Sequence, residues 1–368
     1  MDIKEPEMFT PPQFWCGRDS EPIRRVTWIE LFFDLVFVAA VAQLGARLAD
    51  GVTFDAAWRY ALLFLFVWWA WNGYAVYATR FHSDDALDWT LTLLQMLAVT
   101  FMAANAEGSL DGDDSAGFVA AYAVMRLLLV AQYLRARAVE PARHLVREQA
   151  IGVGVAALVW LASAIAPIPI RYGLWGVAAS LELATALITR RHTGTLPPDA
   201  EHLPERVGLF TLILFGESIV AVMHGIESQP TWSLSAASAA FLGLGLLFAA
   251  WAWYFGPARA AAPRHVRSRD DVRAFELWQY VHLPLYLGLA TGGVIVERVV
   301  KIGGLAAVHA GEAGALAAAV GAIAGSLLVL TALAGRAEPA THSGEPADVF
   351  GNGHFGPASA RASGLRGA

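Results

Sequence analysis

The protein has 368 residues, of which 56% are hydrophobic and only 16% are charged, and its mean hydropathy is +0.47. A soluble protein usually has about a quarter of its residues charged, so this composition excludes an ordinary water-soluble globular protein. One bilayer-spanning helix takes about 20 mainly apolar residues, which leaves room for roughly ten such helices and their loops. The sequence therefore predicts an all-α integral membrane protein with many spans.

Ten apolar stretches follow one another along the chain, separated by short segments that contain Gly, Pro, Asp or Arg. None has the alternating pattern of a barrel strand, and a lipid-facing backbone must satisfy its own hydrogen bonds, so helices are expected. The predicted spans are residues 28–49, 57–78, 88–106, 116–136, 148–167, 171–190, 206–225, 233–256, 275–298 and 312–335. Residues 1–27 are then a cytoplasmic N-terminal segment, 28–335 the membrane domain and 336–368 a disordered cytoplasmic tail.

The basic residues predict the orientation of the spans. Twenty of the 26 Lys and Arg residues fall on the loops that share a side with the N-terminus, and five fall on the other loops: Arg47, Arg59, Arg171, Arg298 and Lys301. Loops rich in Lys and Arg stay in the cytoplasm. We therefore expect both termini to be cytoplasmic, in a multi-pass protein of the bacterial inner membrane.

A parallel internal repeat relates the first four predicted spans to the last four. Arg25, Asp34 and the segment Trp69-Ala70-Trp71 are followed 181, 183 and 182 residues later by Arg206, Glu217 and the segment Trp251-Ala252-Trp253. A nearly constant offset is typical of transporters built from repeats. Chance similarity between apolar helices is the alternative explanation.

Ionisable residues are rare inside spans, and they usually face the interior of a bundle or a water-filled cavity. The ones in this chain are Glu30, Asp34, Arg126, Glu182, Glu217 and His282. Each is predicted to lie between the cytoplasmic boundary and the midplane, so we expect one polar cluster. One Arg cannot neutralise four carboxylates, which favours protonated or water-exposed acids. The alternative is a structural network that only holds the helices together.

Two further segments carry candidate binding residues. The span at 206–225 is preceded by His202, Glu205 and Arg206 around Pro204, which suits a helix start and also suits a cytoplasmic gate or a contact with an anion. No second His/Glu pair accompanies His202 and Glu205, so no metal site is predicted. The span at 57–78 carries aromatic and amide side chains that are typical of a membrane interface or of a pocket, among them Trp68, Trp71 and Asn72.

Two segments of the chain resemble the signature stretches of the bacterial low-temperature-requirement protein A family. They are E-L-F-F-D-L-V-F at Glu30–Phe37 and H-L-P-E-R-V-G-L-F at His202–Phe210, the second continuing to Gly216-Glu217-Ser218. The resemblance runs from about residue 20 to 335. It implies a multi-span inner-membrane protein and brings no biochemical activity with it. Its characteristic positions are Glu30, Asp34, His202, Glu205, Arg206 and Glu217.

Three functions are consistent with these features. In a proton-coupled carrier, Asp34 and Glu217 alternate protonation, Arg126 tunes them, and a small organic molecule binds beside Trp68, Trp71 and Asn72. In a membrane-embedded enzyme, a protonated Glu or Asp acts as a general acid on a lipophilic substrate such as an isoprenoid, for example in a cyclisation. In a scaffold or sensor, the charges are structural. No cofactor and no nucleic-acid partner are expected, and the lipid bilayer is the surrounding partner.

Overall fold

The computed structural model describes residues 10–15, 25–106, 108–110, 115–199, 201–229, 231, 233–262 and 268–337 of the chain. Within these residues it confirms ten helices that are long and apolar enough to cross a bilayer. They are α1 Trp28–Asp50, α2 Phe54–Arg80, α3 Ala86–Ala104, α4 Ser115–Arg135, α5 Arg143–Ile165, α6 Ile170–Thr189, α7 His202–Glu227, α8 Leu234–Phe255, α9 Arg269–Lys301 and α10 Ala310–Ala337. The predicted tail lies outside the described residues except for its first two, and so does most of the N-terminal segment.

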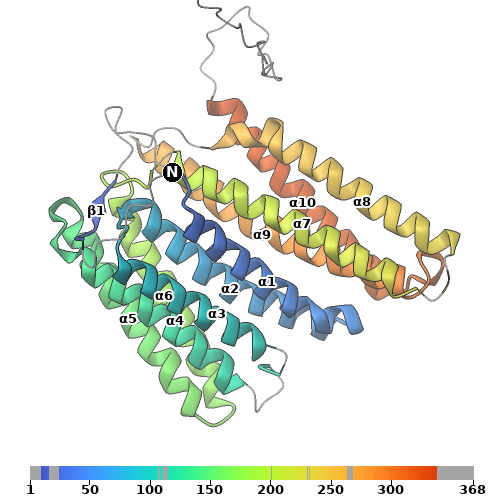
Figure 1. The fold of residues 1–368 in the computed structure, drawn as a ribbon, viewed down its shortest axis with the longest axis horizontal. Helices are drawn as coiled ribbons and strands as arrows, with labels where there is room; N and C mark the ends of the chain where they lie inside the picture. Colours follow the sequence, from blue (N-terminus) through green and yellow to red (C-terminus); the bar gives the residue numbers. More distant parts are fainter. Residues whose placement is uncertain are drawn as a thin grey trace, which may run out of the picture. The chain divides into compact units, whose positions relative to one another are not determined.

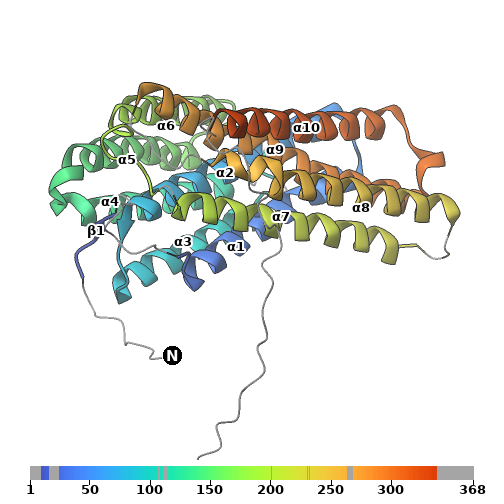
Figure 2. The ribbon, with the colours of Figure 1, turned by 90° about the horizontal axis from the view of Figure 1, so that it is seen from above.

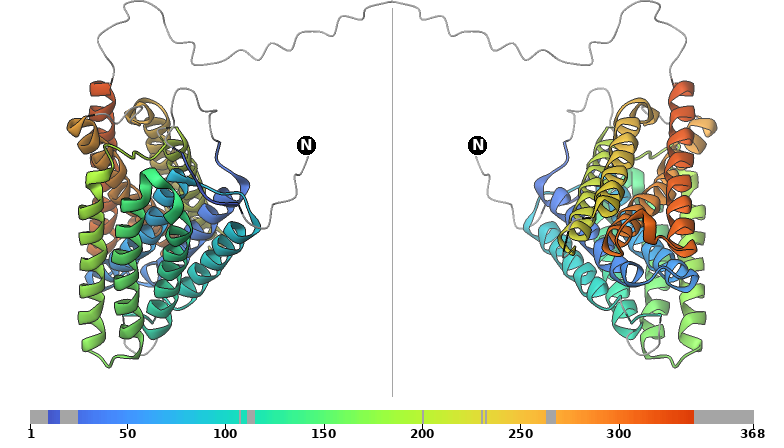
Figure 3. Two further views of the ribbon diagram at one scale, coloured as in Figure 1. Left: turned by 90° about the vertical axis from the view of Figure 1, so that its left-hand side faces the viewer. Right: turned by 90° about the vertical axis from the view of Figure 1, so that its right-hand side faces the viewer.

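The helices lie alongside one another, with α1 and α2 between two groups (Figures 1 and 2). Helices α3 to α6 form one group, in which α4, α5 and α6 pack in sequence order, as Figure 3 shows in green. Helices α7 to α10 form the other group, and α1 contacts both groups through α3, α7 and α9. The apolar window of α2 is 67% buried inside the protein, whereas those of α6 and α10 are 28% buried. Helix α2 is therefore central, and α6 and α10 expose apolar surface that suits lipid.

The two sets of four helices named by the predicted repeat have matching neighbours. Helix α1 packs on α2 and α3, and α4 packs on α3 and α2; likewise α7 packs on α8 and α9, and α10 packs on α9 and α8. The internal repeat itself stays a prediction.

We call the end of the bundle at which α1 begins the N-side and the other end the far side. The assignment of the N-side to the cytoplasm also stays a prediction.

Three helices begin several residues before the predicted spans. Helix α9 begins at Arg269, because Ser268 and Asp271 form a capping box that satisfies the first backbone N–H groups. Helix α7 begins at His202, and Pro204 is tolerated in its first turn, where backbone donors lack helical partners. Helix α5 begins at Arg143, so its first turns carry polar residues. The apolar pattern marks only the membrane-embedded part of such helices.

A small antiparallel pair of strands, β1 Gln13–Phe14 and β2 Phe81–His82, lies at the N-side. Gln13 pairs with His82 and Phe14 with Phe81. The pairing attaches the chain before α1 to the end of α2, where β2 begins. Short 3-10 turns complete the described connections: η1 Ala136–Ala138, η2 Glu140–Ala142, η3 Arg190–His192, η4 Pro257–Ala261 and η5 Leu305–Ala307.

Candidate functional site

Two pairs of ionisable residues, one on α1 and one on α7, meet near the N-side. Glu30 and Asp34 are four residues apart on α1, and His202 and Arg206 are four residues apart on α7. Residues at this spacing share a helical face. Because α1 and α7 run in the same direction (Figure 1), each acid meets the residue 172 positions later. We call these four residues, together with Trp71 of α2, the α1–α7 cluster.

Asp34 is the most enclosed member of the α1–α7 cluster. Its side chain and that of Arg206 are both fully buried. Arg206 Nη2 and Nε donate to Asp34 Oδ1 at 2.8 and 3.2 Å, and Trp71 Nε1 donates to the same oxygen at 2.7 Å. The guanidinium lies over the rings of Phe33 and Tyr74, at 5.4 and 4.9 Å from their centroids. Several donors thus stabilise the Asp34 carboxylate, and aromatic rings enclose the ion pair.

Glu30 extends the cluster toward the start of α1. Its Oε2 lies 3.2 Å from His202 Nε2 and accepts hydrogen bonds from the backbone and hydroxyl of Thr27 at 2.8 and 2.9 Å. Its Oε1 is 4.0 Å from Arg206 Nη1. In the described part of the chain, no three His, Cys, Asp or Glu side chains come together as a group that could hold a metal ion. The cluster therefore joins α1 to α7 by charge and hydrogen bonding.

A second buried ion pair joins α4 to α6. Arg126 Nη2 contacts Glu182 Oε2, and Arg126 Nε lies 3.1 Å from both carboxylate oxygens. Tyr122 O–H and Trp160 Nε1 donate to the same carboxylate at 3.1 and 3.0 Å. Both charged side chains are only 3% exposed. The sequence predicted that Arg126 tunes the carboxyl groups of Asp34 and Glu217. In the structure Arg126 pairs with Glu182, and Asp34 pairs with Arg206.

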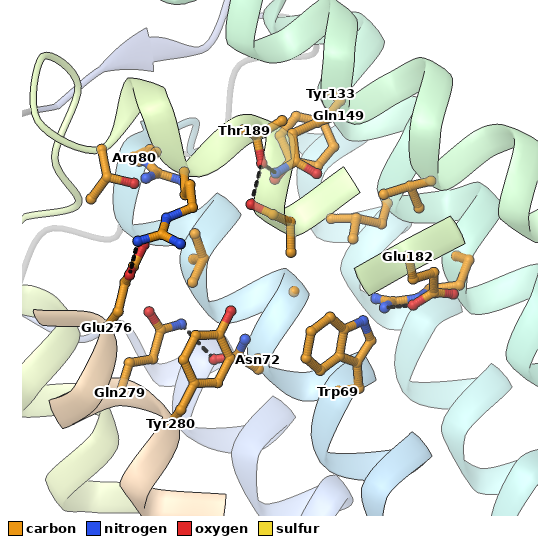
Figure 4. Close-up of a pocket in the computed structure, with 18 of the residues that line it drawn as sticks. Trp69, Asn72, Arg80, Tyr133, Gln149, Glu182, Thr189, Glu276, Gln279 and Tyr280 are labelled. Carbon is orange, nitrogen blue, oxygen red and sulfur yellow. Dashed lines mark hydrogen bonds and ion pairs between the residues drawn. The ribbon is translucent and has the colours of Figure 1, made fainter. Parts of the chain in front are cut away.

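The Arg126–Glu182 pair borders a cavity of about 110 Å³ among α2, α4, α5, α6 and α9 (Figure 4). Thr189, at the N-side end of α6, also lines this cavity, and it lies seven residues after Glu182, or about 10 Å along the helix. On the opposite wall the amide of Gln279 donates to Asn72 Oδ1 at 2.7 Å. The cavity therefore extends from the N-side toward the buried ion pair. We call it the Arg126 cavity.

His282 lies in neither ion pair. Its Nδ1 is 2.7 Å from the carbonyl oxygen of Trp278, so Nδ1 carries the proton and Nε2 accepts from the Tyr254 hydroxyl at 3.1 Å. The Tyr254 hydroxyl also accepts from Thr211 at 3.2 Å, and Thr211 lies 2.9 Å from the hydroxyl of Tyr286. This arrangement holds a neutral imidazole within a hydroxyl network that links α7, α8 and α9.

The remaining predicted site residues are dispersed. Glu217 is half-buried on α7 and makes no hydrogen bond or ion pair with a residue that the structure describes. Glu205 lies 3.7 Å from Arg25, and Trp68 is buried with its ring 6.1 Å from that of Tyr280. The predicted single cluster is thus replaced by two separate groups of ion pairs, with His282 and Glu217 in neither. Residue spacing sets the face of a helix but not which helix lies opposite.

A third charged group, at the N-side, was not predicted from the sequence. Asp85, the residue before α3, accepts hydrogen bonds from the backbone N–H groups of Thr10 and Asp88, both at 2.8 Å. Arg135 of α4 pairs with it at 2.6 Å. Burial raises the pKa of the Asp85 carboxyl, but these backbone donors and the Arg135 guanidinium outweigh burial and hold the pKa below its usual value. The only sequence signal was the typical N-cap position of an Asp before an apolar run.

Comparison with known proteins shows which family the chain belongs to. The model of the bacterial low temperature requirement A protein (LtrA) family matches residues 25–350. An uncharacterised protein of Rhizobium meliloti (strain 1021) is 29% identical over 308 residues, which cover 77% of this chain and 71% of that protein. No solved structure matches. With a match that spans most of its length, the chain belongs to the family of bacterial low temperature requirement A proteins.

Proposed function

We propose that the protein is a proton-coupled carrier of a small organic molecule, located in the bacterial cytoplasmic membrane with its N-side in the cytoplasm. Two cavities at opposite ends of the bundle carry this proposal. The Arg126 cavity extends from the N-side, and a cavity of about 440 Å³ at the far side is lined by the end of α1 and the beginning of α2. Leu63 lines the far-side cavity and Trp69 lines the Arg126 cavity. These residues are six positions apart on α2, or about 9 Å along the helix.

A barrier this short suits alternating access, in which small helix movements close one cavity and open the other. Between Leu63 and Trp69, α2 carries buried side chains that include Phe64, Phe66 and Val67. The α1–α7 cluster packs against the same helix through Trp71. A change in the contact between α1 and α7 therefore reaches α2 two residues after Trp69, next to the segment that separates the cavities.

We assign the coupling proton to Glu182. It is the carboxylate at the inner end of the Arg126 cavity, whereas neither Asp34 nor Glu217 lines either cavity. Asp34 is also held by Arg206 and Trp71, and Glu217 lies apart from both ion pairs. These positions favour Glu182 for the coupling role over Asp34 and Glu217, the pair that the predicted internal repeat favours.

Reconstitution tests the carrier proposal. Purified protein in liposomes containing the pH-sensitive dye pyranine is given an inward proton gradient and a panel of small acids, amines, amides and sugars. We expect at least one solute to accumulate together with acidification of the interior, and a protonophore to abolish that accumulation. If folded protein moves none of the solutes faster than protein-free liposomes do, the carrier proposal fails.

The enzyme alternative has its own supporting observation. A second N-side cavity, of about 250 Å³, is lined by Glu205 and His282 together with Trp278, Tyr254 and Phe255. A carboxylic acid beside aromatic faces, here Glu205, suits protonation of an olefin and stabilisation of the resulting cation. Incubation of active membranes with linear isoprenoid diphosphates and alcohols tests this role. Cyclised products that are absent from Glu205→Gln membranes would support it, and unchanged substrates across the panel would exclude it.

A further inference from the structure

One guanidinium nitrogen of Arg126 has no partner in the part of the chain that the structure describes. Arg126 is 2% exposed, and Glu182 engages its Nε and Nη2. Its Nη1 is buried and makes no hydrogen bond. On the adjacent turn of α2, a methyl group at Gly73 would lie 2.7 Å from Nη1, so the glycine keeps this side of the guanidinium clear. Buried donors are rarely left without an acceptor, and a donor beside an open space is ready to bind one.

The other charges around the Arg126 cavity favour a negative ligand. Arg80 is 5% exposed, and its Nε donates to the carbonyl oxygen of Leu196 at 3.2 Å. No described carboxylate lies within ion-pair distance of Arg80. Arg190 at the mouth pairs with Glu276 at 2.9 Å. With Arg126 and Glu182 also paired, Arg80 leaves an uncompensated positive charge along the path from the N-side, which attracts anions.

The uncharged walls limit the size and shape of the ligand. Figure 4 shows Trp69, Asn72 and Tyr280 along the edge of the cavity that faces Thr189 and Gln149. The rings of Trp69 and Tyr280 are nearly parallel, at 18° and with centroids 6.3 Å apart. A cavity of about 110 Å³ has the volume of about four water molecules at roughly 30 Å³ each. The space therefore suits a molecule of a few carbon atoms with an apolar side and one acidic end.

We propose that the Arg126 cavity binds a small organic monoanion, whose acidic oxygen accepts a hydrogen bond from Arg126 Nη1. This inference deepens the proposed carrier function and rests on it for the transport step. When the anion binds at Nη1, two buried negative groups contact one guanidinium, and the other donors to Glu182, Tyr122 and Trp160, are uncharged. Arg80 lies seven residues after Gly73 on α2, or about 10 Å farther toward the N-side, so it attracts the anion along the path and does not pair with it at Nη1. Two such anions are too costly to keep ionised together, so Glu182 takes up one proton from water at the N-side. One proton and one anion then move together without net charge.

Calorimetric titration of the full chain in detergent tests the anion site separately from transport. The probes are acetate, 2-oxobutyrate, benzoate and inorganic phosphate, each carboxylate being paired with its neutral amide. We expect at least one carboxylate to bind at least tenfold more tightly than its amide. Binding of phosphate alone points to an inorganic anion and overturns the organic ligand. Equal binding of acids and amides, or no binding, overturns the anion site.

Three variants tie that binding to the cavity. Arg126→Gln/Glu182→Gln replaces the ion pair by a neutral pair, and we expect it to abolish carboxylate binding in folded protein. Gly73→Ala crowds Nη1, and Arg80→Gln removes the uncompensated charge without leaving any carboxylate unpaired; each should weaken binding roughly tenfold, or about 1.4 kcal/mol. Gly176→Ala is the matched control, because a methyl group there meets nothing within 4 Å.

Unchanged affinity in Gly73→Ala and Arg80→Gln overturns the assignment. Carboxylate binding without uptake in liposomes keeps the anion site and overturns the carrier.

Discussion

The α1–α7 cluster and the Arg126 cavity both bury an arginine against a carboxylate, but they differ in access to water. In the α1–α7 cluster, Arg206 and Asp34 are both fully buried and lie under aromatic rings, and they border neither proposed cavity. Nη1 of each arginine lacks a hydrogen-bond partner among the described residues, but Nη1 of Arg206 lies 4.0 Å from Glu30 Oε1, whereas Nη1 of Arg126 adjoins Gly73 in the wall of a cavity. An enclosed pair fixes two helices to each other, whereas a pair at the end of a cavity is able to exchange partners. The same residue types thus serve structure in one place and binding in the other.

The largest effect is expected where the enclosed pair is broken. Asp34→Asn leaves Arg206 buried without its main counter-charge, and loss of one partner of a buried pair costs about 3–5 kcal/mol. The free energy of unfolding by SDS titration measures this loss. The double variant Asp34→Asn/Arg206→Gln should recover most of it, because no charge then remains unpaired. A loss below about 1 kcal/mol for Asp34→Asn would mean that the cluster is not enclosed.

Two tryptophans of α2, Trp71 in the α1–α7 cluster and Trp68 outside it, provide a matched comparison. Trp71 donates to Asp34 at 2.7 Å, whereas Trp68 Nε1 has no hydrogen-bond partner among the described residues, and both side chains are 2% exposed. Trp71→Phe should therefore lower stability by about 1.5–3 kcal/mol more than Trp68→Phe, since hydrogen bonds to charged groups are worth that amount. Thermal unfolding of both variants measures the difference. Equal losses would show that the indole contributes by packing alone.

At the Arg126 cavity, loss of the carboxylate should lower the free energy of unfolding less than at Asp34, but it should have a larger effect on proton-coupled transport. Glu182→Gln keeps an oxygen acceptor for Arg126, and cavity water can solvate the guanidinium, so we expect a loss of about 1–3 kcal/mol. In liposomes, accumulation driven by a proton gradient should disappear, while exchange of solute across the membrane continues. Glu276→Gln, on the same cavity, is the control. Retained proton-driven accumulation in Glu182→Gln would remove Glu182 from the coupling step.

The smallest effect concerns acid stability at Asp85. Because the pKa of its carboxyl is lower in the folded chain than in the unfolded chain, its contribution is fully present above the unfolded value, near 4. The contribution is lost as the pH falls through the folded pKa. As the pH falls from 6 to 3, the unfolding temperature should therefore decrease less steeply in Asp85→Asn than in the wild type. Parallel pH profiles would contradict this role.

The sequence predicted the class of fold and most of the important side chains, but not their pairing. The ten spans followed from runs of apolar residues, and the rare charges within them were easily identified. The four-residue spacing of Glu30 and Asp34, and that of His202 and Arg206, placed each pair on one helical face, but it did not show that the two faces meet. No spacing linked Arg126 to Glu182 either, since each spacing constrains only its own helix. Arg80 was counted with the loops because it ends a span, yet it lines the Arg126 cavity.

One measurement tests the difference between the two ion pairs most directly: the rise in unfolding temperature that small carboxylates produce in the wild type and in two charge-neutral variants. A ligand that binds only the folded state stabilises it by RT ln(1 + L/Kd), where L is the free ligand concentration, so tighter binding gives a larger rise. We predict that the rise is lost in Arg126→Gln/Glu182→Gln and kept in Asp34→Asn/Arg206→Gln. If the rise persists without the Arg126–Glu182 pair, or disappears only without the Asp34–Arg206 pair, the assignment of the binding site to the Arg126 cavity is wrong.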